Sequence, residues 1–154
     1  CMCLRCREYG RQLKLHPELH TTIPQLFIEE YEASGGKEFF ITYEDPLRRA
    51  VYAFVRMRVG GTQDEKLLGL MPELSGAAFI RELHTYGHIV PIGASAGETS
   101  AQHKGLGRKL MEEAEKIARE HGATTMLVIS GIGVREYYGK LGYTHAGTYM
   151  GKSL

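Results

Sequence analysis

The sequence has no apolar run near the roughly 18 residues that a membrane-spanning helix requires, and its amino end lacks the apolar stretch of a signal peptide. Cysteine is also scarce: Cys1, Cys3 and Cys6 all fall within the first six positions and have no later partners. An odd, tight cluster of this kind does not form the disulfide framework of a secreted domain. We therefore expect a cytoplasmic protein without a membrane partner.

Net charge is nearly absent, because 19 Lys and Arg residues are balanced by 18 Asp and Glu residues. The overall charge therefore says nothing about nucleic acid as a partner. The basic residues are nevertheless grouped, and such groups indicate either a basic face for nucleic acid or ordinary solvated surface. The two groups are Arg5, Arg7, Arg11 and Lys14 near the amino end, and Arg48, Arg49, Arg56 and Arg58.

Length and composition are those of one folded domain. The 154 residues suffice for a single core, and 43% hydrophobic with 24% charged residues argues against disorder. No internal repeat, linker or low-complexity segment interrupts the chain. Because it begins with Cys1 and not with Met, we expect it to be a piece of a longer protein.

Apolar and polar residues alternate over 25–32, 38–43 and 50–59, which predicts three β-strands separated by short turns. Three strands with short connections predict an antiparallel meander. A fourth strand is expected over 77–86, which carries charged and polar groups that a plain core strand does not need. The small-residue-rich stretch 87–101 predicts a loop.

The spacing of apolar residues then predicts a helix over 106–121, with Gly122 as its C-terminal stop. The continuous apolar run 125–130 predicts a strand parallel to the fourth strand, because a strand–helix–strand succession of this length favours a crossover. A shorter helix is expected over 131–141 and a final strand over 143–149. The fold class is therefore α/β, with a mixed, mostly antiparallel sheet flanked by helices.

The segment QHKGLG, residues 102–107, stands immediately before the helix and predicts an anion site. The first N–H groups of a helix lack intrahelical partners and lie at the positive end of its dipole. Gly105 and Gly107 remove side chains there, so a pyrophosphate can approach the backbone. Two glycines before a helix also occur in plain tight turns, and the segment matches neither a Walker loop nor a complete dinucleotide-binding fingerprint.

The setting of this loop resembles that of the GNAT N-acetyltransferases. Their loop pattern Q/R-x-x-G-x-G/A is matched by Gln102, Gly105 and Gly107, and their helix-ending pattern Y-x-x-x-G-(F/Y) by Tyr138, Gly142 and Tyr143. The resemblance implies that acetyl-CoA lays its pyrophosphate on the loop and its pantetheine arm along the fourth strand. The cofactor-binding residues it implies are Glu82, Leu83, His84, Thr85, Gln102, His103, Lys104, Gly105, Leu106, Gly107, Arg108 and Tyr138.

Longer blocks resemble one branch of that family, the Elongator catalytic subunits. These blocks span essentially the whole chain. They are CMCLRCRE (1–8), YEASGGKEFF (31–40), YEDP (43–46), IRELHTYGH (80–88), QHKGLGRKLMEEAEKIA (102–118), VISGIGVREYYGKLGY (128–143) and YMGK (149–152).

This narrower resemblance implies a tRNA carboxymethyluridine synthase that uses acetyl-CoA as its carbon source at the wobble uridine. The partners it implies are tRNA, a radical S-adenosylmethionine domain of the same parent chain with its iron–sulfur cluster, and other Elongator subunits. That domain lies outside this sequence, which has no C-x3-C-x2-C motif. We therefore expect the chain to hold acetyl-CoA without completing the modification.

The family resemblance also implies roles at the thioester. Tyr138 takes the position of the tyrosine that hydrogen-bonds the CoA sulfur and protonates the departing thiolate, with Tyr137 as its close rival. His84, Glu82 and His103 are candidate bases or water-positioning groups. Backbone N–H groups at Leu83–Thr85 are candidates for polarising the acetyl carbonyl.

Cys1, Cys3 and Cys6 are spaced so that they can share one zinc ion, which prefers four ligands. The resemblance implies a zinc site at a junction between domains, with His16 or His20 open as a fourth ligand. We accordingly divide the chain into a cysteine-rich junction over residues 1–15 and a GNAT domain over 16–154.

Two other functions remain open from the sequence. A protein-lysine or small-amine N-acetyltransferase would share the acetyl-CoA site and differ in its acceptor pocket, which variable loops build. A non-catalytic RNA-binding or assembly module would explain the basic amino-terminal stretch, although the intact glycine loop and Tyr138 argue against it.

Overall fold

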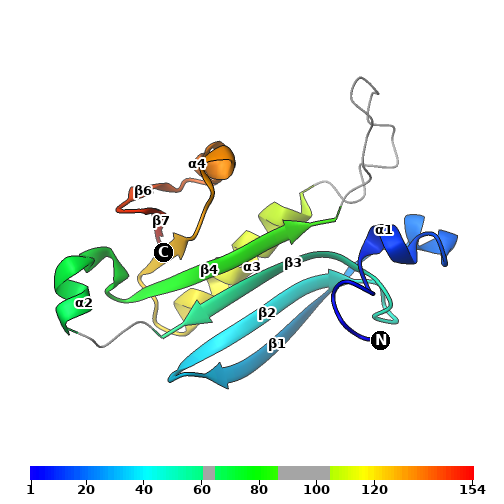
Figure 1. Cartoon of the computed structure of the whole chain (residues 1–154), viewed down its shortest axis with the longest axis horizontal. Helices are drawn as coiled ribbons and strands as arrows, with labels where there is room; N and C mark the ends of the chain where they lie inside the picture. The colour runs from blue at the N-terminus through cyan, green and yellow to red at the C-terminus, as the bar shows by residue number, and fades with distance from the viewer. Residues whose placement is uncertain (61–64, 87–104) are drawn as a thin grey trace.

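The computed structural model describes residues 1–60, 65–86 and 105–154, and its sheet begins with an antiparallel meander (Figure 1). Strand β1 (Gln25–Ala33) pairs with β2 (Gly36–Glu44), and β2 pairs with β3 (Val51–Val59). Strand β4 (Ala77–Thr85) adds to β3, also antiparallel. The three-strand meander and the fourth strand expected from the alternation of apolar residues are therefore confirmed.

The β1–β2 connection is a two-residue turn at Ser34 and Gly35, both with positive φ. Positive φ at both central residues is what a hairpin turn compatible with strand twist requires.

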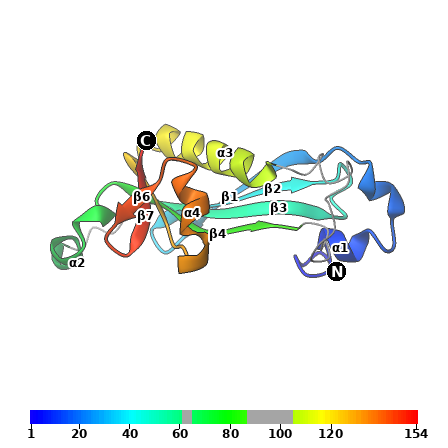
Figure 2. The same cartoon turned by 90° about the horizontal axis from the view of Figure 1, so that it is seen from above.

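The predicted crossover is also confirmed. Helix α3 (Leu106–Glu120) follows β4 in the fold order and leads into β5 (Thr125–Val128), which pairs parallel to β4. Leu110 and Ala114 on α3 are fully buried against the sheet. Figure 2 shows α3 covering one face of the meander. Gly122 stands just past the helix with φ +79°, so it ends the helix as expected.

The carboxyl-terminal part differs from the expectation. A single final strand over 143–149 is wrong: the chain forms a hairpin of β6 (Thr144–Ala146) and β7 (Tyr149–Ser153). Gly147, at φ +59°, makes the reversal, which a continuous strand pattern conceals. Strand β7 lies between β5 and β6, so the seven-stranded order is β1-β2-β3-β4-β5-β7-β6.

The second predicted helix is shorter than expected. A 3-10 turn, η4 (Ile132–Val134), precedes α4 (Arg135–Gly139). Four further short elements were not predicted, because three to six residues are too few to establish a helical period. They are α1 (Tyr9–Gln12), η1 (Pro17–His20), α2 (Glu65–Leu70) and η2 (Pro72–Leu74).

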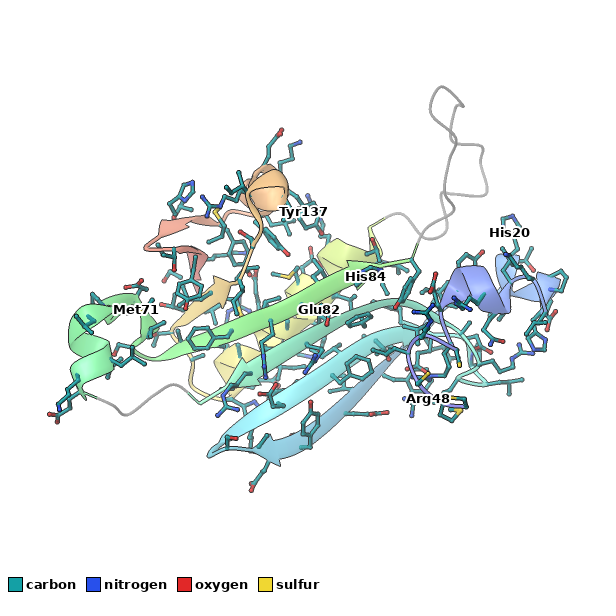
Figure 3. All side chains as sticks on the ribbon, viewed as in Figure 1. His20, Arg48, Met71, Glu82, His84 and Tyr137 are labelled. Atoms are coloured by element: carbon teal, nitrogen blue, oxygen red, sulfur yellow. The ribbon has the colours of Figure 1, made fainter. Side chains whose placement is uncertain are left out.

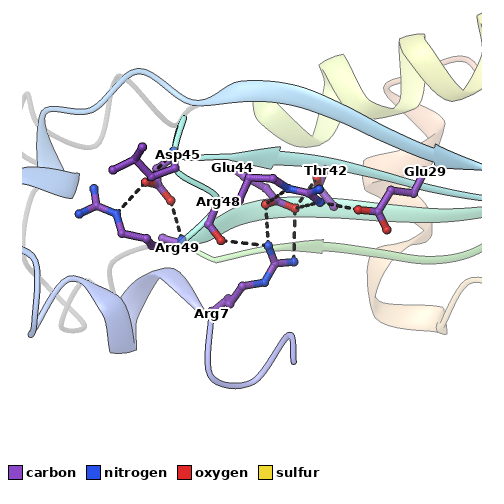
Figure 4. Close-up of polar contacts among 9 residues, drawn as sticks. Arg7, Glu29, Thr42, Glu44, Asp45, Arg48 and Arg49 are labelled. Atoms are coloured by element: carbon purple, nitrogen blue, oxygen red, sulfur yellow. Dashed lines mark hydrogen bonds and ion pairs between the residues drawn. The ribbon is translucent and has the colours of Figure 1, made fainter. Parts of the chain in front are cut away.

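The amino-terminal segment packs onto one end of the sheet. Tyr9 is 1% exposed, and its ring lies 4.7 Å from that of Tyr52 on β3. Arg7 lies on the sheet face opposite α3 and donates a 2.6 Å hydrogen bond to the fully buried Glu44 (Figure 4). Residues within the proposed junction 1–15 thus contribute to the core, while the boundary at residue 15 stays a prediction.

In the part of the chain that the structure describes, no helix has both the length and the apolarity to cross a membrane.

Candidate acetyl-CoA site

Strands β4 and β5 run together for four residue pairs and then separate. Their pairing extends from Ala77↔Thr125 to Ile80↔Val128, and the N–H of Ile129 still donates to the Ile80 carbonyl at 3.1 Å. The separation coincides with a β-bulge. Arg56 and Met57 on β3 oppose Glu82 and Ile80. Arg81 is therefore the extra residue, and bulges bend a strand. Beyond it, β4 continues to Thr85 with only β3 as its neighbour among the described strands (Figure 1).

The free edge of β4 carries backbone donors. The Tyr86 N–H donates to the Tyr52 carbonyl on β3 at 2.8 Å. Since backbone groups alternate in direction along a strand, the N–H of His84 also faces β3. The N–H groups of Leu83 and Thr85 therefore face the side that β5 has left. These two residues belong to the segment expected to bind the pantetheine arm.

The start of α3 lies beside this edge. Gly105 caps the helix with φ +86° and no side-chain cap, so the first N–H groups of α3 have no side-chain acceptor there. A Cβ placed on Gly107 would lie 2.8 Å from the Tyr137 hydroxyl and 3.4 Å from Thr85 Cγ2. Leu106 is buried and Arg108 is exposed. The predicted binding residues Gln102, His103 and Lys104 lie outside the described residues.

Tyr137 and Tyr138 on α4 have different surroundings. Tyr138 is 6% exposed and Tyr137 is 38% exposed, and their rings meet edge-on at 5.3 Å. Burial raises the pKa of both hydroxyls, although Arg108 opposes the shift at Tyr137. Both hydroxyls are therefore neutral donors near pH 7. Among the described residues, neither has a hydrogen-bond partner.

Glu82 and His84 point to the sheet face opposite α3 (Figure 3). The His84 ring stacks on Phe54 with centroids 5.7 Å apart and lies 4.5 Å from Tyr86. Glu82 lies 3.7 Å from Arg56 in an exposed ion pair. Leu83 instead packs against the core on the α3 side. The expected bases therefore lie on the far face of β4 from the helix that carries Gly107.

A cavity of about 1040 Å³ opens at the end of β4. One wall is formed by His84, Thr85 and Tyr86, and the other by residues 6 and 8–15 of the amino-terminal segment. A molecule in this cavity would meet β4 next to the Thr85 N–H, which points away from β3.

Sequence reasoning missed Ser130 and Arg135. Within the structure's described residues, Ser130 Oγ and Arg135 Nε are buried and have no hydrogen-bond partner. Ser130 follows β5 directly after the point of strand separation, and Arg135 begins α4. A buried polar atom without a partner calls for an explanation such as a bound ligand. The sequence feature that could have pointed to Ser130 is its hydroxyl at the end of the apolar run 125–130.

The three cysteines lie together as expected from their spacing. The thiol sulfurs of Cys1, Cys3 and Cys6 all lie within 4.8 Å of one another, and all three residues are exposed. Hydrogen bonds from the backbone N–H and the thiol of Cys6 lower the pKa of Cys3. The set offers three of the four ligands that zinc prefers. His16 lies 3.5 Å from Glu18, and His20 lies 3.5 Å from the Tyr9 hydroxyl, so both candidate fourth ligands contact other groups.

Comparison with known proteins gives a consistent set of similarities. A family model described as "Acetyltransferase (GNAT) family" matches residues 16–143. The tRNA uridine(34) acetyltransferase of Methanocaldococcus jannaschii is 45% identical over an alignment of 159 residues that covers the whole chain and 28% of that protein. Elongator complex protein 3 of Drosophila melanogaster is 43% identical over an alignment of 156 residues that again covers the whole chain and 27% of that protein.

A solved structure of Methanocaldococcus infernus Elp3 with an N-terminal deletion (1-46) is also similar, with 40% identity and a TM-score of 0.77. It covers the whole chain and 35% of that structure's chain. The chain thus spans about a third or less of the length of these relatives, and it matches their C-terminal region.

Proposed function

Because this chain belongs to the GNAT acetyltransferase family and matches the C-terminal region of Elp3 proteins, we propose that it binds acetyl-CoA and assists thioester cleavage during tRNA uridine modification. The observation that carries the proposal is the separation of β4 from β5, which leaves a free strand edge beside the glycine start of α3 and the tyrosines of α4.

Each part of acetyl-CoA has a matching feature. The pyrophosphate would lie at the start of α3, where Gly107 has no side chain and the helix dipole favours an anion. The pantetheine amides would pair with the free edge of β4 as an added strand does. The N–H groups of Leu83 and Thr85 are the available donors, and one of them would point at the acetyl carbonyl.

At the thioester, the proposed reaction is hydrolysis. Water adds to the carbonyl carbon, the carbon–sulfur bond breaks, and the sulfur leaves as a thiolate that takes a proton. Tyr138 is the proposed proton donor, with Tyr137 as its rival, because burial keeps both hydroxyls protonated. The partnerless Ser130 hydroxyl lies at the end of β5 and is a further candidate for a hydrogen bond to the ligand.

In the full reaction, a radical S-adenosylmethionine domain with an iron–sulfur cluster would join the acetyl methyl carbon to carbon 5 of the tRNA wobble uridine. This chain would hold the acetyl group, with the cavity beside His84 and Tyr86 open to the acceptor. Cys1, Cys3 and Cys6 would hold zinc where the two domains meet, with a fourth ligand from elsewhere. The tRNA and other Elongator subunits are the proposed partners.

The cavity also favours a second candidate function. A lysine or small amine entering it would place its nitrogen near His84, a candidate base for the proton that amine acetylation releases. In that case the acetyl group would appear on an amine and uridine would be unchanged.

The deciding experiment uses the protein that contains this chain, supplied with tRNA, acetyl-CoA and S-adenosylmethionine. Mass spectrometry of the wobble uridine should detect a carboxymethyl group. Gly107→Glu should abolish it, because its side chain would displace the Tyr137 hydroxyl, which lies 2.8 Å from the Cβ position, and would place a carboxylate beside the proposed pyrophosphate site. Acetyl-CoA affinity should fall at least about 100-fold.

Gly69→Glu is the matched control, since Gly69 is exposed on α2 and a Cβ there meets open space. Acetylated lysine with unmodified uridine would favour the amine acetyltransferase. Acetyl-CoA binding that survives Gly107→Glu would overturn the assignment of the α3 start as the pyrophosphate site.

A further inference from the structure

A buried carboxylate stands in the middle of α3, away from the proposed ligand site. Glu115 is 5% exposed. It accepts a 2.8 Å hydrogen bond from the Tyr143 hydroxyl and bonds of 2.9 and 2.8 Å from Lys152 Nζ. Arg119 adds a longer contact of 3.5 Å. The carboxylate therefore joins α3 to β7 and to the residue that directly precedes β6.

A row of aromatic contacts runs from this carboxylate to the ligand site. Tyr143 meets Tyr138 edge-on at 6.0 Å, and Tyr138 meets Tyr137 edge-on at 5.3 Å. The Tyr137 hydroxyl then reaches the start of α3 beside Gly107. The contacts therefore connect α4 to α3 at two places. One is Glu115, through Tyr143, and the other is Gly107, beside the Tyr137 hydroxyl.

Helix α4 has few internal interactions that could fix its position. It has five residues, no side-chain cap, and Tyr138 as its one buried residue among those the structure describes. So short a helix is unstable by itself, because nucleation costs more than one turn of hydrogen bonds returns. Its orientation therefore depends on Tyr138 and on Tyr143, whose N–H donates to the Tyr138 carbonyl at 3.1 Å.

We propose that Glu115 is a positioning residue, which sets the place of the two α4 tyrosines at the acetyl-CoA site through its hydrogen bond to Tyr143. The inference rests on the proposed function. A hydrogen bond to a carboxylate is directional and stronger than one between neutral groups, so it fixes where the Tyr143 ring lies along α3.

The first test compares Glu115→Gln with Glu120→Gln in this chain. The amide keeps the size of Glu115 but presents an NH₂ group to donors and loses the charge that Lys152 meets. We expect the Kd for acetyl-CoA to rise about tenfold, as for one misplaced hydrogen bond, and the Kd for adenosine 3′,5′-bisphosphate to change less than about twofold. Glu120 is exposed on the same helix, so its variant should change neither Kd.

The two ligands separate positioning from general loss of structure. Adenosine 3′,5′-bisphosphate lacks the pantetheine arm and thioester, so displaced tyrosines should not affect it. Equal loss of affinity for both ligands would overturn the proposal and leave Glu115 as a residue of general stability. Tyr143→Phe should reproduce part of the effect, and the double variant should be no weaker than Glu115→Gln, because both changes break the same bond.

A second measurement needs no ligand. Hydrogen–deuterium exchange in the free chain should accelerate about tenfold in the peptide covering 135–143 of Glu115→Gln, while exchange in β2 and β3 stays unchanged. Unchanged exchange in that peptide would refute the positioning role. If the unaltered chain fails to bind acetyl-CoA, the proposed function fails, and the exchange data still decide whether Glu115 orders α4.

Discussion

At the scale of single residues, Tyr137 and Tyr138 compete for one role. Tyr138 stands in the position that the family pattern implies, but the residue is only 6% exposed, and the rings of Tyr137 and Tyr143 meet its ring edge-on. Tyr137 is more exposed, and its hydroxyl lies beside Gly107. A hydroxyl that protonates the thiolate must reach the sulfur, whereas one that binds the pantetheine arm need only lie between the start of α3 and Thr85 on β4.

We therefore expect Tyr138→Phe to slow CoA release from the protein that contains this chain by about 100-fold, the usual size of a general-acid contribution. Acetyl-CoA affinity and tRNA binding should be unchanged. Since burial raises the pKa of Tyr138, its proton is retained up to higher pH than in a free tyrosine, and the wild-type rate should stay level past about pH 10. Stopped-flow detection of free thiol measures the rate.

Tyr137→Phe is the matched control for Tyr138→Phe, because it removes the hydroxyl oxygen of the neighbouring tyrosine. It should raise the Kd for acetyl-CoA and leave the rate of CoA release at saturation near the wild-type value. The opposite result, with Tyr137→Phe slow and Tyr138→Phe normal, would exchange the two roles.

The candidate site residues that the sequence indicates are those that belong to a local pattern. The glycines 105 and 107, the tyrosine pair and the three cysteines are all placed by local spacing. Ser130 was missed because its significance comes from a missing partner, which depends on the strands around it. The sequence also did not indicate that Glu82 and His84 lie on the sheet face opposite α3, because this too depends on the surrounding strands. A bulge at Arg81 sets which residues of β4 point away from α3, and bulges leave no reliable mark in an alternating pattern.

At the scale of elements, the edge of β4 that faces away from β3 allows a test of backbone hydrogen bonds to acetyl-CoA. Thr85→Pro should lower acetyl-CoA affinity about tenfold, because proline removes the N–H that is proposed to donate to the ligand. The ladder to β3 should survive, since Thr85 is exposed and its N–H points away from β3. Isothermal titration gives the affinity, and thermal unfolding checks the fold.

Thr85→Val controls for the hydroxyl, because it keeps the backbone N–H and the branched shape. Normal binding by Thr85→Val together with weak binding by Thr85→Pro assigns the effect to the backbone. Full binding by Thr85→Pro would mean that this N–H is not a donor to acetyl-CoA.

Long elements were predictable from the sequence and short ones were not. Helix α3 and the parallel pairing of β4 with β5 follow from a sustained helical period between two strand patterns. The β6–β7 hairpin and the 3-10 turn before α4 depend on single residues such as Gly147 and on tertiary contacts that a period cannot express. The short helix α2 lacks any buried residue among those described, so it leaves no apolar stripe to detect.

At the scale of the whole molecule, buried carboxylates tie the amino-terminal segment to the sheet. Glu44 is fully buried and accepts hydrogen bonds from Arg7, Arg48 and Thr42. Asp45 is also fully buried and accepts from the Ala50 N–H at 2.6 Å. Burial alone would raise the pKa of each carboxyl, but these hydrogen bonds outweigh it and hold both pKa values below their ordinary range.

The pH dependence of the free energy of unfolding follows from the lowered pKa values of Glu44 and Asp45. A carboxyl with a lowered pKa in the folded state stabilises the protein above its ordinary pKa and loses this contribution as the pH falls. Urea unfolding midpoints should therefore drop steeply below about pH 4. Glu44→Gln should cost about 3 kcal/mol at pH 7, by leaving Arg7 without its charge partner, and should flatten the acid dependence.

Glu29→Gln is the comparison, because Glu29 is half-exposed and, among the described residues, forms an ion pair with Arg48 alone, at 2.5 Å. It should cost less than about 1 kcal/mol. Equal acid sensitivity in the wild type and Glu44→Gln would show that other groups control the acid limit.

The position of β7 has a consequence for biosynthesis. Residues 149–153 form an interior strand between β5 and β6, although the ribosome makes them after both neighbours. The meander β1–β4 can assemble early from contacts close in sequence, whereas β5 and α4 must wait for β7 to emerge. Lys152, a partner of Glu115, arrives with it. We therefore expect a nascent chain to complete the proposed acetyl-CoA site last, and a chain that stops short of β7 to lack that site.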